Sequence, residues 1–578
     1  MIKSKLARLG ALALAGTLVA TMAACAPASD TPEDSSGTGG TITYLGVGGQ
    51  WEGADPASVY YGNEIAAFRR LVYRGLVAFP IDDPDTPPVA DLATDAGTTD
   101  DGGLTWTFTI KDDVTWQDGS PITGEDFVYG LSRSFDPTLV NATGVGTAYL
   151  GSYASSVVEA GYEGPFTSTP EAQAVFDEHF SADGQTVTYK FDQAWADFPL
   201  SAASLLVTDP YQKSFDDGST LWAINSNGPY KLDGDELDGQ SGGTFVRNEN
   251  YDPASDSTEL RQALPDEFIF EFVSDTDVLF QRLLSEQGDD SAAFADLNIP
   301  ASFYSQITGD VEARSVKSDS PYTRFLEINS LTVTDPKVRR AMSIALNREG
   351  VLGAYGGENY GKVSSSIMST GLTGYEDNPT FSADAPAGDP EAAKALLAEA
   401  GTPNPEITFA FADSPTNQTL APVIEQSLEA AGFQVSLSPI SPDATPGYYG
   451  QMSDRSKNGQ KVDLFLAGWA ADWPSASTVV APILLSNPEG AESGVGFNYG
   501  FYSNPDVDAL IKQGQAEVDP DAAASLYAQA DAAAAADGAY VPMVNQSNYF
   551  LYGSRVKNFE PTAASNFYPD FGKISVAE

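Results

Sequence analysis

Residues 463–474 read DLFLAGWAADWP. Apolar residues occupy both alternating sets from 464 to 470, which predicts a strand buried on both faces. Asp472 follows in the loop just beyond this strand, between Trp469 and Trp473. A carboxylate between two indoles at the end of a strand is suited to hold a cation. The alternative is that Asp472 caps the turn before the next proline and that both tryptophans belong to the core.

Strands and helices alternate around this stretch without a regular strand–helix–strand repeat. Period-two patterns predict strands over 104–110 and 185–191, whereas one apolar face with helical spacing predicts a helix over 65–76. Asp335 directly before a proline predicts the start of another helix. At 578 residues the chain is longer than a single hydrophobic core supports. We therefore expect an α/β (mixed α+β) chain with several lobes.

The charge and the scarcity of two residue types exclude several functions. The chain carries 30 Lys+Arg against 80 Asp+Glu, a net charge of −50, which excludes binding to a phosphate backbone. One Cys and one His leave no internal disulfide and no Cys- or His-based metal cluster, so we expect neither a metal site nor a cofactor. His179 lies in a polar helical stretch, which favours a solvated surface histidine over a catalytic base.

Gly239–Gly243 matches the G-x-S-x-G pattern of a hydrolase nucleophile. That chemistry needs a strand before the serine, a helix after it and a histidine downstream. Here a polar turn precedes the serine, a strand-like run follows it, and the single histidine lies upstream. The pattern is typical of a hairpin loop, and we expect no enzymatic activity.

The N-terminus has the form of an export signal. Three cations precede the small apolar run from Leu9 to Ala24, which is shorter than the roughly 20 residues that span a bilayer. We predict a signal peptide over residues 1–24. The run ends in Met-Ala-Ala-Cys, which resembles the lipobox of bacterial lipoproteins and implies that Cys25 is lipidated; the alternative is a simple signal peptide cut after a small residue. The polar, Pro/Gly/Ser-rich stretch within residues 25–40 predicts a flexible tether.

Five segments, in the same order along the chain, resemble the extracytoplasmic solute-binding proteins of peptide-type ABC importers, bacterial family 5. The resemblance runs from about residue 41 to the C-terminus. Within the fourth segment, we expect the helix to bury one face and to expose Arg339, Arg340 and Arg348. The five segments are residues 54–56 with 70–77, 101–128, 227–232, 338–349 and 463–474.

The resemblance implies a periplasmic-binding-protein-like fold of type II, with two main lobes, a hinge and an extra third lobe. In this arrangement lobe I is discontinuous and combines residues 41–80, 185–324 and 541–578. Residues 81–184 form lobe II, the extra lobe. Residues 325–540 form lobe III, the ligand-binding lobe.

The resemblance also assigns roles to candidate site residues. Asp472, beside Trp469, is expected to pair with the α-ammonium of a bound peptide. The backbones of Gly468 and Ala470 are expected to pair with the peptide main chain, as an added strand does. Tyrosines suit an apolar cleft that must satisfy hydrogen bonds when it closes. The resemblance places five further residues near the ligand: Tyr60, Tyr61, Gly62, Asn498 and Tyr549.

We therefore expect a non-catalytic, lipid-anchored receptor on the outer face of the cytoplasmic membrane. It captures a small solute, a dipeptide or oligopeptide, by lobe closure and delivers it to an ABC permease and ATPase complex. It acts as a monomer, contacts the membrane through its lipid anchor only and binds no nucleic acid. The alternatives are the same fold binding an oligosaccharide or another non-peptide solute, a peptide-sensing receptor, and a secreted hydrolase.

Overall fold

The computed structural model describes residues 38–81, 87–139, 145–218, 221–372, 375–453, 462–486 and 497–577. The expected signal peptide and Cys25 lie outside the described residues. Gly37–Glu578 form one compact unit, and the lobe boundaries expected from the sequence stay a prediction. Across the described ranges, each helix is too short or too polar to cross a bilayer.

β15 (Leu464–Ala470) lies inside a six-stranded sheet, antiparallel to β11 and parallel to β13. Leu464 and Leu466 pack into the apolar cluster on one face of this sheet, and Phe465 and Ala467 pack into the cluster on the other. Burial on both faces explains the two interleaved apolar sets. In order across the sheet, the strands are β12 (Gly361–Val363), β16 (Tyr540–Leu551), β11 (Ser315–Ile328), β15, β13 (Glu406–Ala412) and β14 (Gln434–Ile440).

Two further sheets carry their own apolar cores. The five-stranded sheet has the order β10 (Ala293–Phe294), β1 (Thr41–Val47), β9 (Glu267–Val273), β8 (Gly242–Arg247) and β7 (Tyr230–Leu232). The three-stranded sheet has the order β4 (Thr105–Thr109), β6 (Thr186–Lys190) and β5 (Phe180–Asp183). Both predicted period-two strands therefore pair with each other, as β4 and β6. The short pairs are β2 (Val77–Ala78) with β3 (Val89–Ala90), and β17 (Val556–Lys557) with β18 (Ser575–Val576).

Proline sets the start of many helices. In α5, α8, α10, α11, α12, α16 and α17, a proline opens the helix behind an Asp, Asn, Ser or Thr whose side chain accepts a backbone N–H. The described helices are α1 (Gly62–Leu71), α2 (Gly124–Arg133), α3 (Val145–Tyr153), α4 (Ser155–Glu159), α5 (Pro170–His179), α6 (Phe198–Ser204), α7 (Thr276–Ser285), α8 (Pro336–Ala345), α9 (Arg348–Tyr355), α10 (Pro379–Ser382), α11 (Pro390–Glu399), α12 (Pro415–Ala430), α13 (Tyr448–Ser453), α15 (Ser477–Leu484), α16 (Pro505–Ala516) and α17 (Pro520–Ala536).

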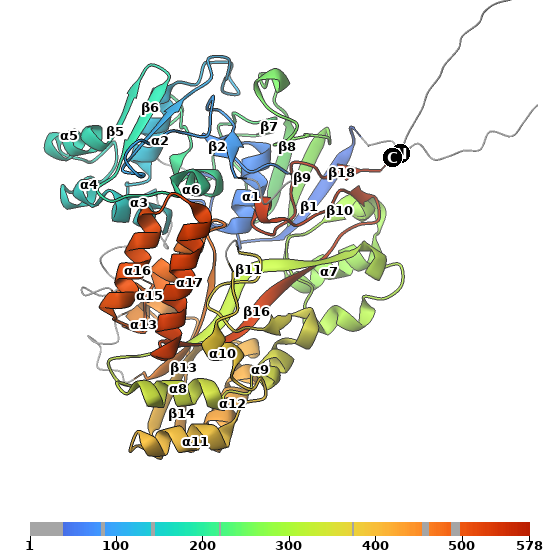
Figure 1. Ribbon diagram of the computed structural model, residues 1–578. Coiled ribbons are helices and arrows are strands. Elements are labelled where there is room, and N and C mark those ends of the chain that lie inside the picture. The colour runs from blue at the N-terminus through green and yellow to red at the C-terminus, as the bar shows by residue number, and fades with distance from the viewer. Residues whose placement is uncertain are drawn as a thin grey trace, which may run out of the picture. The chain divides into compact units, whose positions relative to one another are not determined.

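The two long strands β11 and β16 connect the cores of the two larger sheets. Near the start of β16, Val541 packs with β13 and β15 residues in the core of the six-stranded sheet. Near its end, Tyr549 and Leu551 pack with Leu45 of β1. Figure 1 shows this strand pair running from the region of β1, β9 and β10 to the region of β13 and α12. The pair is thus the continuous link between the two cores.

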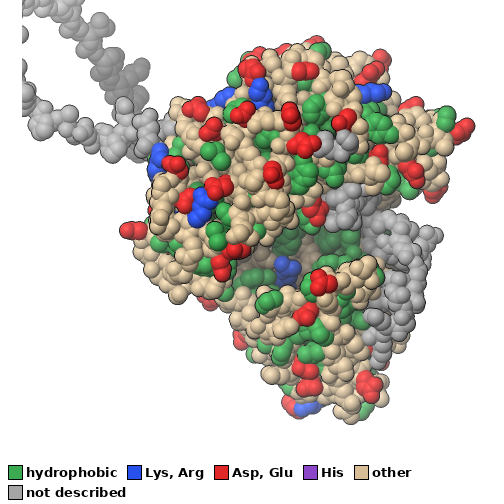
Figure 2. Space-filling view, turned by 180° about the vertical axis from the view of Figure 1, so that it is seen from behind, with side chains coloured by type: hydrophobic (Ala, Val, Ile, Leu, Met, Phe, Trp, Pro, Cys, Tyr) green, Lys and Arg blue, Asp and Glu red, His purple; other side chains and the backbone are tan. Residues whose placement is uncertain are grey.

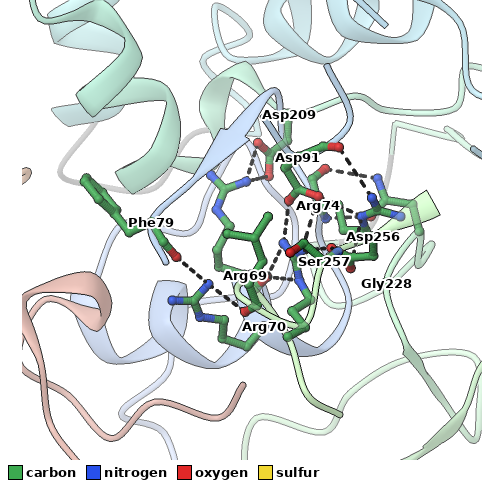
Figure 3. Close-up of polar contacts among 12 residues, drawn as sticks. Arg69, Arg70, Arg74, Phe79, Asp91, Asp209, Gly228, Asp256 and Ser257 are labelled. Atoms are coloured by element: carbon green, nitrogen blue, oxygen red, sulfur yellow. Dashed lines mark hydrogen bonds and ion pairs between the residues drawn. The ribbon is translucent and has the colours of Figure 1, made fainter. Parts of the chain in front are cut away.

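A buried network of arginines and aspartates holds α1 in place. Arg69 and Arg70 of α1 and Arg74 just beyond it each meet a carboxylate, and their side chains are at most 5% exposed. Arg70 pairs with Asp570 at 3.0 Å. Figure 3 shows the pairs Arg69–Asp209, at 2.7 Å, and Arg74–Asp91, at 2.8 Å. Although burial raises the pKa of Asp91, Arg261 and Arg74 outweigh it and hold that pKa well below its usual range. The C-terminal end of α1 is thereby fixed against the rest of the fold.

Two expectations about charged side chains are wrong. Arg339 and Arg348 are buried, because their guanidinium groups donate to backbone carbonyl oxygens, those of Asp537 at 3.0 Å and Pro542 at 2.8 Å. His179 is 9% exposed, since its imidazole contacts the Val175 carbonyl oxygen and the Asp192 carboxylate. Long or amphipathic side chains can bury their polar groups where carbonyl or carboxylate oxygens lie within hydrogen-bonding distance.

Candidate functional site

A cavity of about 200 Å³ lies beyond the C-terminal end of β15. Four stretches that are distant in sequence contribute to its wall, within residues 60–70, 203–205, 468–474 and 563–568. Figure 2 shows a hollow in one face of the molecule, with hydrophobic side chains and a Lys or Arg side chain inside it. Seven of the nine ligand-binding residues expected from the sequence line the cavity: Tyr60, Tyr61, Gly62, Gly468, Trp469, Ala470 and Asp472.

Asp472 accepts hydrogen bonds from three hydroxyl groups. Tyr60 donates to Oδ1, whereas Tyr149 and Thr478 donate to Oδ2 at 2.7 Å and 3.0 Å. The Thr478 hydroxyl also accepts the backbone N–H of Asp472 at 3.1 Å. Tyr60 lies two residues before α1, Tyr149 lies in α3 and Thr478 lies in α15. Three elements therefore converge on one carboxylate and orient it.

Burial changes the acidity of this group. Desolvation raises the pKa of Asp472 from its usual 3.8 to about 6, because it outweighs the hydrogen bonds from the three hydroxyls. Burial, followed by the charge of Asp472, raises the pKa of Tyr60 and of Tyr149 well above 10. The two phenols therefore stay neutral donors at physiological pH. A cation that enters the cavity meets a carboxylate that is already positioned.

The two indoles beside Asp472 have different surroundings. Trp469 lines the cavity and donates its N–H to the Thr478 carbonyl oxygen at 2.7 Å. Trp473 also lines the cavity, but it is 2% exposed, and its N–H donates to Asp197 at 2.8 Å. Its ring centroid lies 4.7 Å from that of Tyr149. Trp473 thus belongs to a core and to the cavity wall at once.

The start of α1 supplies a second side of the wall. Tyr61 is 37% exposed and donates its hydroxyl to Glu52 at 2.9 Å. Gly62 opens the helix, and a methyl group on it would lie 2.8 Å from the ring of Tyr568. Glycine therefore lets Tyr568 approach the helix and complete the wall from the C-terminal region.

Asn498 and Tyr549 do not line this cavity. Asn498 is 6% exposed, donates to the Tyr502 carbonyl oxygen at 2.7 Å and accepts the Tyr502 N–H at 3.0 Å. Tyr549 is 8% exposed and packs against Tyr304, with ring centroids 5.8 Å apart. Both side chains organise their own segments in this structure, and their contact with a ligand stays a prediction.

Tyr149 and Thr478 are site residues that the sequence argument missed. Tyr149 lies 323 positions from Asp472, and nothing in its local pattern distinguishes it from a core tyrosine. Thr478 follows Asp472 by six positions, and the short Asp-to-Thr spacing across a turn was the available signal. Among the described residues, no group of three acidic, His or Cys side chains is arranged to hold a metal ion.

A cavity between the six-stranded sheet and the start of α1, with an oriented carboxylate in its wall, is suited to bind a small solute. Residues 87–491 match the family model described as bacterial extracellular solute-binding proteins, family 5 Middle, and the chain belongs to this family. Its members are non-enzymatic, extracytoplasmic solute-binding proteins that serve ABC transporters. The resemblance recognised in the sequence, the mixed α/β fold and the absence of enzymatic activity are thereby confirmed.

Known relatives share sequence with this chain, and solved structures share its fold. The chain is 23% identical to the dipeptide-binding protein DppE of Bacillus subtilis over 473 residues. This aligned stretch covers 78% of each of the two chains. A solved structure, the clavulanic acid biosynthesis oligopeptide binding protein 2, superposes with a TM-score of 0.82 at 24% identity and covers 94% of this chain and 96% of its own. The ABC transporter-associated periplasmic binding protein DppA of Helicobacter pylori was solved with the peptide STSA. It superposes with a TM-score of 0.67 at 18% identity, and the match covers 94% of this chain and 99% of that protein.

Proposed function

We propose that this protein captures a short peptide in the cavity beside β15 and delivers it to an ABC permease and its ATPase. The observation that carries the proposal is the carboxylate of Asp472, which faces the cavity and is held by three hydroxyls. DppE is a dipeptide-binding protein, and the Helicobacter pylori protein was solved in complex with a peptide; both support a peptide as the solute.

Asp472 binds the α-ammonium of the peptide in this proposal. Two opposite charges about 4 Å apart attract each other by about 4 kcal/mol at an effective dielectric constant near 20, before desolvation. The indoles of Trp469 and Trp473, on either side of Asp472 in sequence, also line the cavity. The attraction by the carboxylate and the presence of the two indoles favour a single cation at this end of the ligand.

The main chain of β15 offers the peptide a free strand edge. β13 pairs with β15 only at Leu464 and Phe465, and no other described strand pairs with β15 on that side. The Tyr448 hydroxyl bonds the carbonyl oxygens of Ala410 and Leu466, so the Leu466 carbonyl faces this side. Since backbone groups alternate between the two edges of a strand, those of Gly468 and Ala470 face the same side. These two residues therefore receive the peptide as an added strand.

Lobe closure encloses the ligand in this proposal. The wall joins residues that are distant in sequence, since Tyr60 and Tyr149 both bond Asp472 from other parts of the fold. Asp197 likewise accepts bonds from Trp473 at 2.8 Å and from Ser477 at 2.5 Å. Breaking these few polar contacts opens the cavity, and the strand pair β11 and β16 is suited to act as the hinge.

We further propose that the protein is a monomer held to the outer face of the cytoplasmic membrane by a lipid on Cys25. The lipobox-like sequence before Cys25 and the polar stretch after it support this anchor. Metabolic labelling with a radiolabelled fatty acid tests it: wild-type protein is expected to incorporate the label, and Cys25→Ser is not.

Titration calorimetry with trialanine and N-acetyl-trialanine tests the proposed function. Acetylation removes the ammonium, and loss of one partner of such a pair costs about 2–5 kcal/mol, or about 30-fold to several-thousand-fold in affinity. We expect wild type to lose at least about tenfold in affinity on acetylation and Asp472→Asn to bind both peptides equally weakly.

The matched control is Asp531→Asn. Asp531 is also a buried carboxyl, bonded by Tyr540 and by Asn378 at 3.0 Å, but it does not line the cavity. This variant is expected to discriminate between the two peptides as wild type does. Equal binding of both peptides to wild type would contradict the ammonium site, and binding of oligosaccharides in place of any peptide would contradict the proposed function.

A further inference from the structure

Trp473 packs into a different hydrophobic core from its neighbours in sequence. Ala471 and Ala476, on either side of it, belong to the core on one face of the six-stranded sheet. Trp473 belongs instead to the core around the three-stranded sheet, whose other buried members lie between residues 76 and 207. Its indole therefore crosses from the loop after β15 into another part of the fold.

The socket that receives this indole contains two aromatic rings. The ring centroids of Tyr149 in α3 and Trp195 just before α6 lie 4.7 Å and 6.2 Å from that of Trp473. Close by, the Ala196 N–H donates to the Gln515 carbonyl oxygen of α16 at 3.3 Å. Figure 1 shows α3 and α6 beside the pair α16 and α17. The socket thus belongs to the region of the three-stranded sheet, whereas the indole comes from the ligand-binding loop.

Asp197 supplies the polar side of the socket. Its Oδ2 atom accepts the indole N–H of Trp473 at 2.8 Å and the hydroxyl of Ser477 at 2.5 Å. The same indole N–H lies 3.2 Å from the Ser477 hydroxyl oxygen, so the three groups are in mutual contact. One carboxylate oxygen therefore holds two donors that follow β15.

The helix on which Asp197 lies makes no use of this carboxylate. Asp197 is the N-cap residue of α6, and an aspartate there commonly accepts an N–H of the first turn. In α6 no such side-chain bond forms, because Pro199 has no N–H and the Leu200 N–H donates to the Asp197 carbonyl oxygen at 3.0 Å. The carboxylate is thus free to bind Trp473 and Ser477.

We propose that Trp473, Ser477 and Asp197 form a latch that holds the cavity closed and sets how fast a bound peptide leaves. The inference rests on the proposed function, in which the cavity opens to release its ligand. The latch joins protein groups directly, so it favours closure with or without a peptide. Because Trp473 follows Asp472, the latch also holds the ligand-binding carboxylate in place. Asp197 does not line the cavity and is therefore a positioning residue.

Stopped-flow fluorescence of trialanine dissociation tests the latch. Asp197→Ala removes the acceptor of two hydrogen bonds, and we expect dissociation at least about tenfold faster than from wild type. Asp197→Asn keeps an acceptor oxygen and is expected to recover most of the wild-type rate. Ser477→Ala, also outside the cavity, is expected to add little to Asp197→Ala in a double-mutant cycle.

The matched control is Asp192→Ala. Asp192 precedes Asp197 by five residues, and its carboxylate bonds Ser156 and His179 within the region of the three-stranded sheet. This variant is expected to release trialanine at the wild-type rate. A wild-type rate in Asp197→Ala itself would overturn the latch.

Two further measurements separate the latch from the proposed function. Asp197→Ala is expected to retain the wild-type ratio of affinities for trialanine and N-acetyl-trialanine, because the latch does not contact the ammonium; loss of this ratio would overturn the latch. Small-angle X-ray scattering without peptide is expected to give a larger radius of gyration for Asp197→Ala than for wild type, and equal radii would overturn it. If no peptide binds wild type, the proposed function fails, and the scattering comparison still decides whether the latch exists.

Discussion

Replacing Asp472 by Asn is expected to stabilise the ligand-free protein at neutral pH. Burial raises the pKa of this carboxyl group from 3.8 to about 6, so the folded state binds the proton more tightly than the unfolded state does. The free energy of unfolding therefore falls as the pH rises from about 4 to about 6 and stays lower above it. Asn does not ionise and avoids this loss.

The size of the effect follows from the same pKa. A rise from 3.8 to about 6, at about 1.4 kcal/mol for each pH unit, corresponds to about 3 kcal/mol. The amide must share its oxygen among the Tyr60, Tyr149 and Thr478 hydroxyls or make them reorient, which costs about 1 kcal/mol. We expect a net gain of about 2 kcal/mol at pH 7.5. At pH 4 the carboxyl group of the unfolded chain is about half ionised, so we expect a loss of about 0.5 kcal/mol there.

Denaturant unfolding of both proteins between pH 4 and pH 8, without ligand, measures this difference. The exposed Asp443→Asn is the control, because it removes the same charge from a chain of net charge −50 without touching the cavity. The difference between Asp472→Asn and wild type is expected to change sign between pH 4 and pH 7.5. A difference that stays constant over this range would refute the argument that Asp472 is desolvated in the folded state.

Two further perturbations have clear expected outcomes. Gly468→Ala places a methyl group in the cavity wall, 2.7 Å from the Arg324 guanidinium, so trialanine binding, measured by calorimetry, is expected to weaken at least about tenfold. The far-ultraviolet circular dichroism spectrum is expected to stay unchanged. Wild-type affinity in this variant would contradict the close approach. Arg70→Met leaves Asp570, whose side chain is 0% exposed, without its cation, and denaturant unfolding is expected to show a loss of about 3–5 kcal/mol. A loss below about 1 kcal/mol would show that the α1 network contributes little to stability.

The local sequence pattern was sufficient to predict much of the fold and part of the candidate site. The two interleaved apolar sets of residues 464–470 correspond to a strand buried on both faces, and Asp335 begins α8 as its cap. The loop after β15 reaches the cavity because it continues directly from a buried strand. These features depend on neighbours within a few residues, which a sequence displays.

The remainder depends on contacts between distant residues. Tyr149 reaches Asp472 across 323 positions, which no local pattern encodes. Arg339 and Arg348 were expected at the surface from helical amphipathicity, but their long side chains reach carbonyl oxygens inside the fold.

The open edge of β15 has a consequence for the behaviour of the chain in solution. Unpaired strand edges are sites where proteins aggregate through intermolecular sheets. Gly468 and Ala470 pair with β11, but no described strand pairs with them on the side of β13. They form part of the wall of a cavity of about 200 Å³, which is too confined for the sheet of a second molecule to dock. The recess thus protects a vulnerable strand edge from self-association.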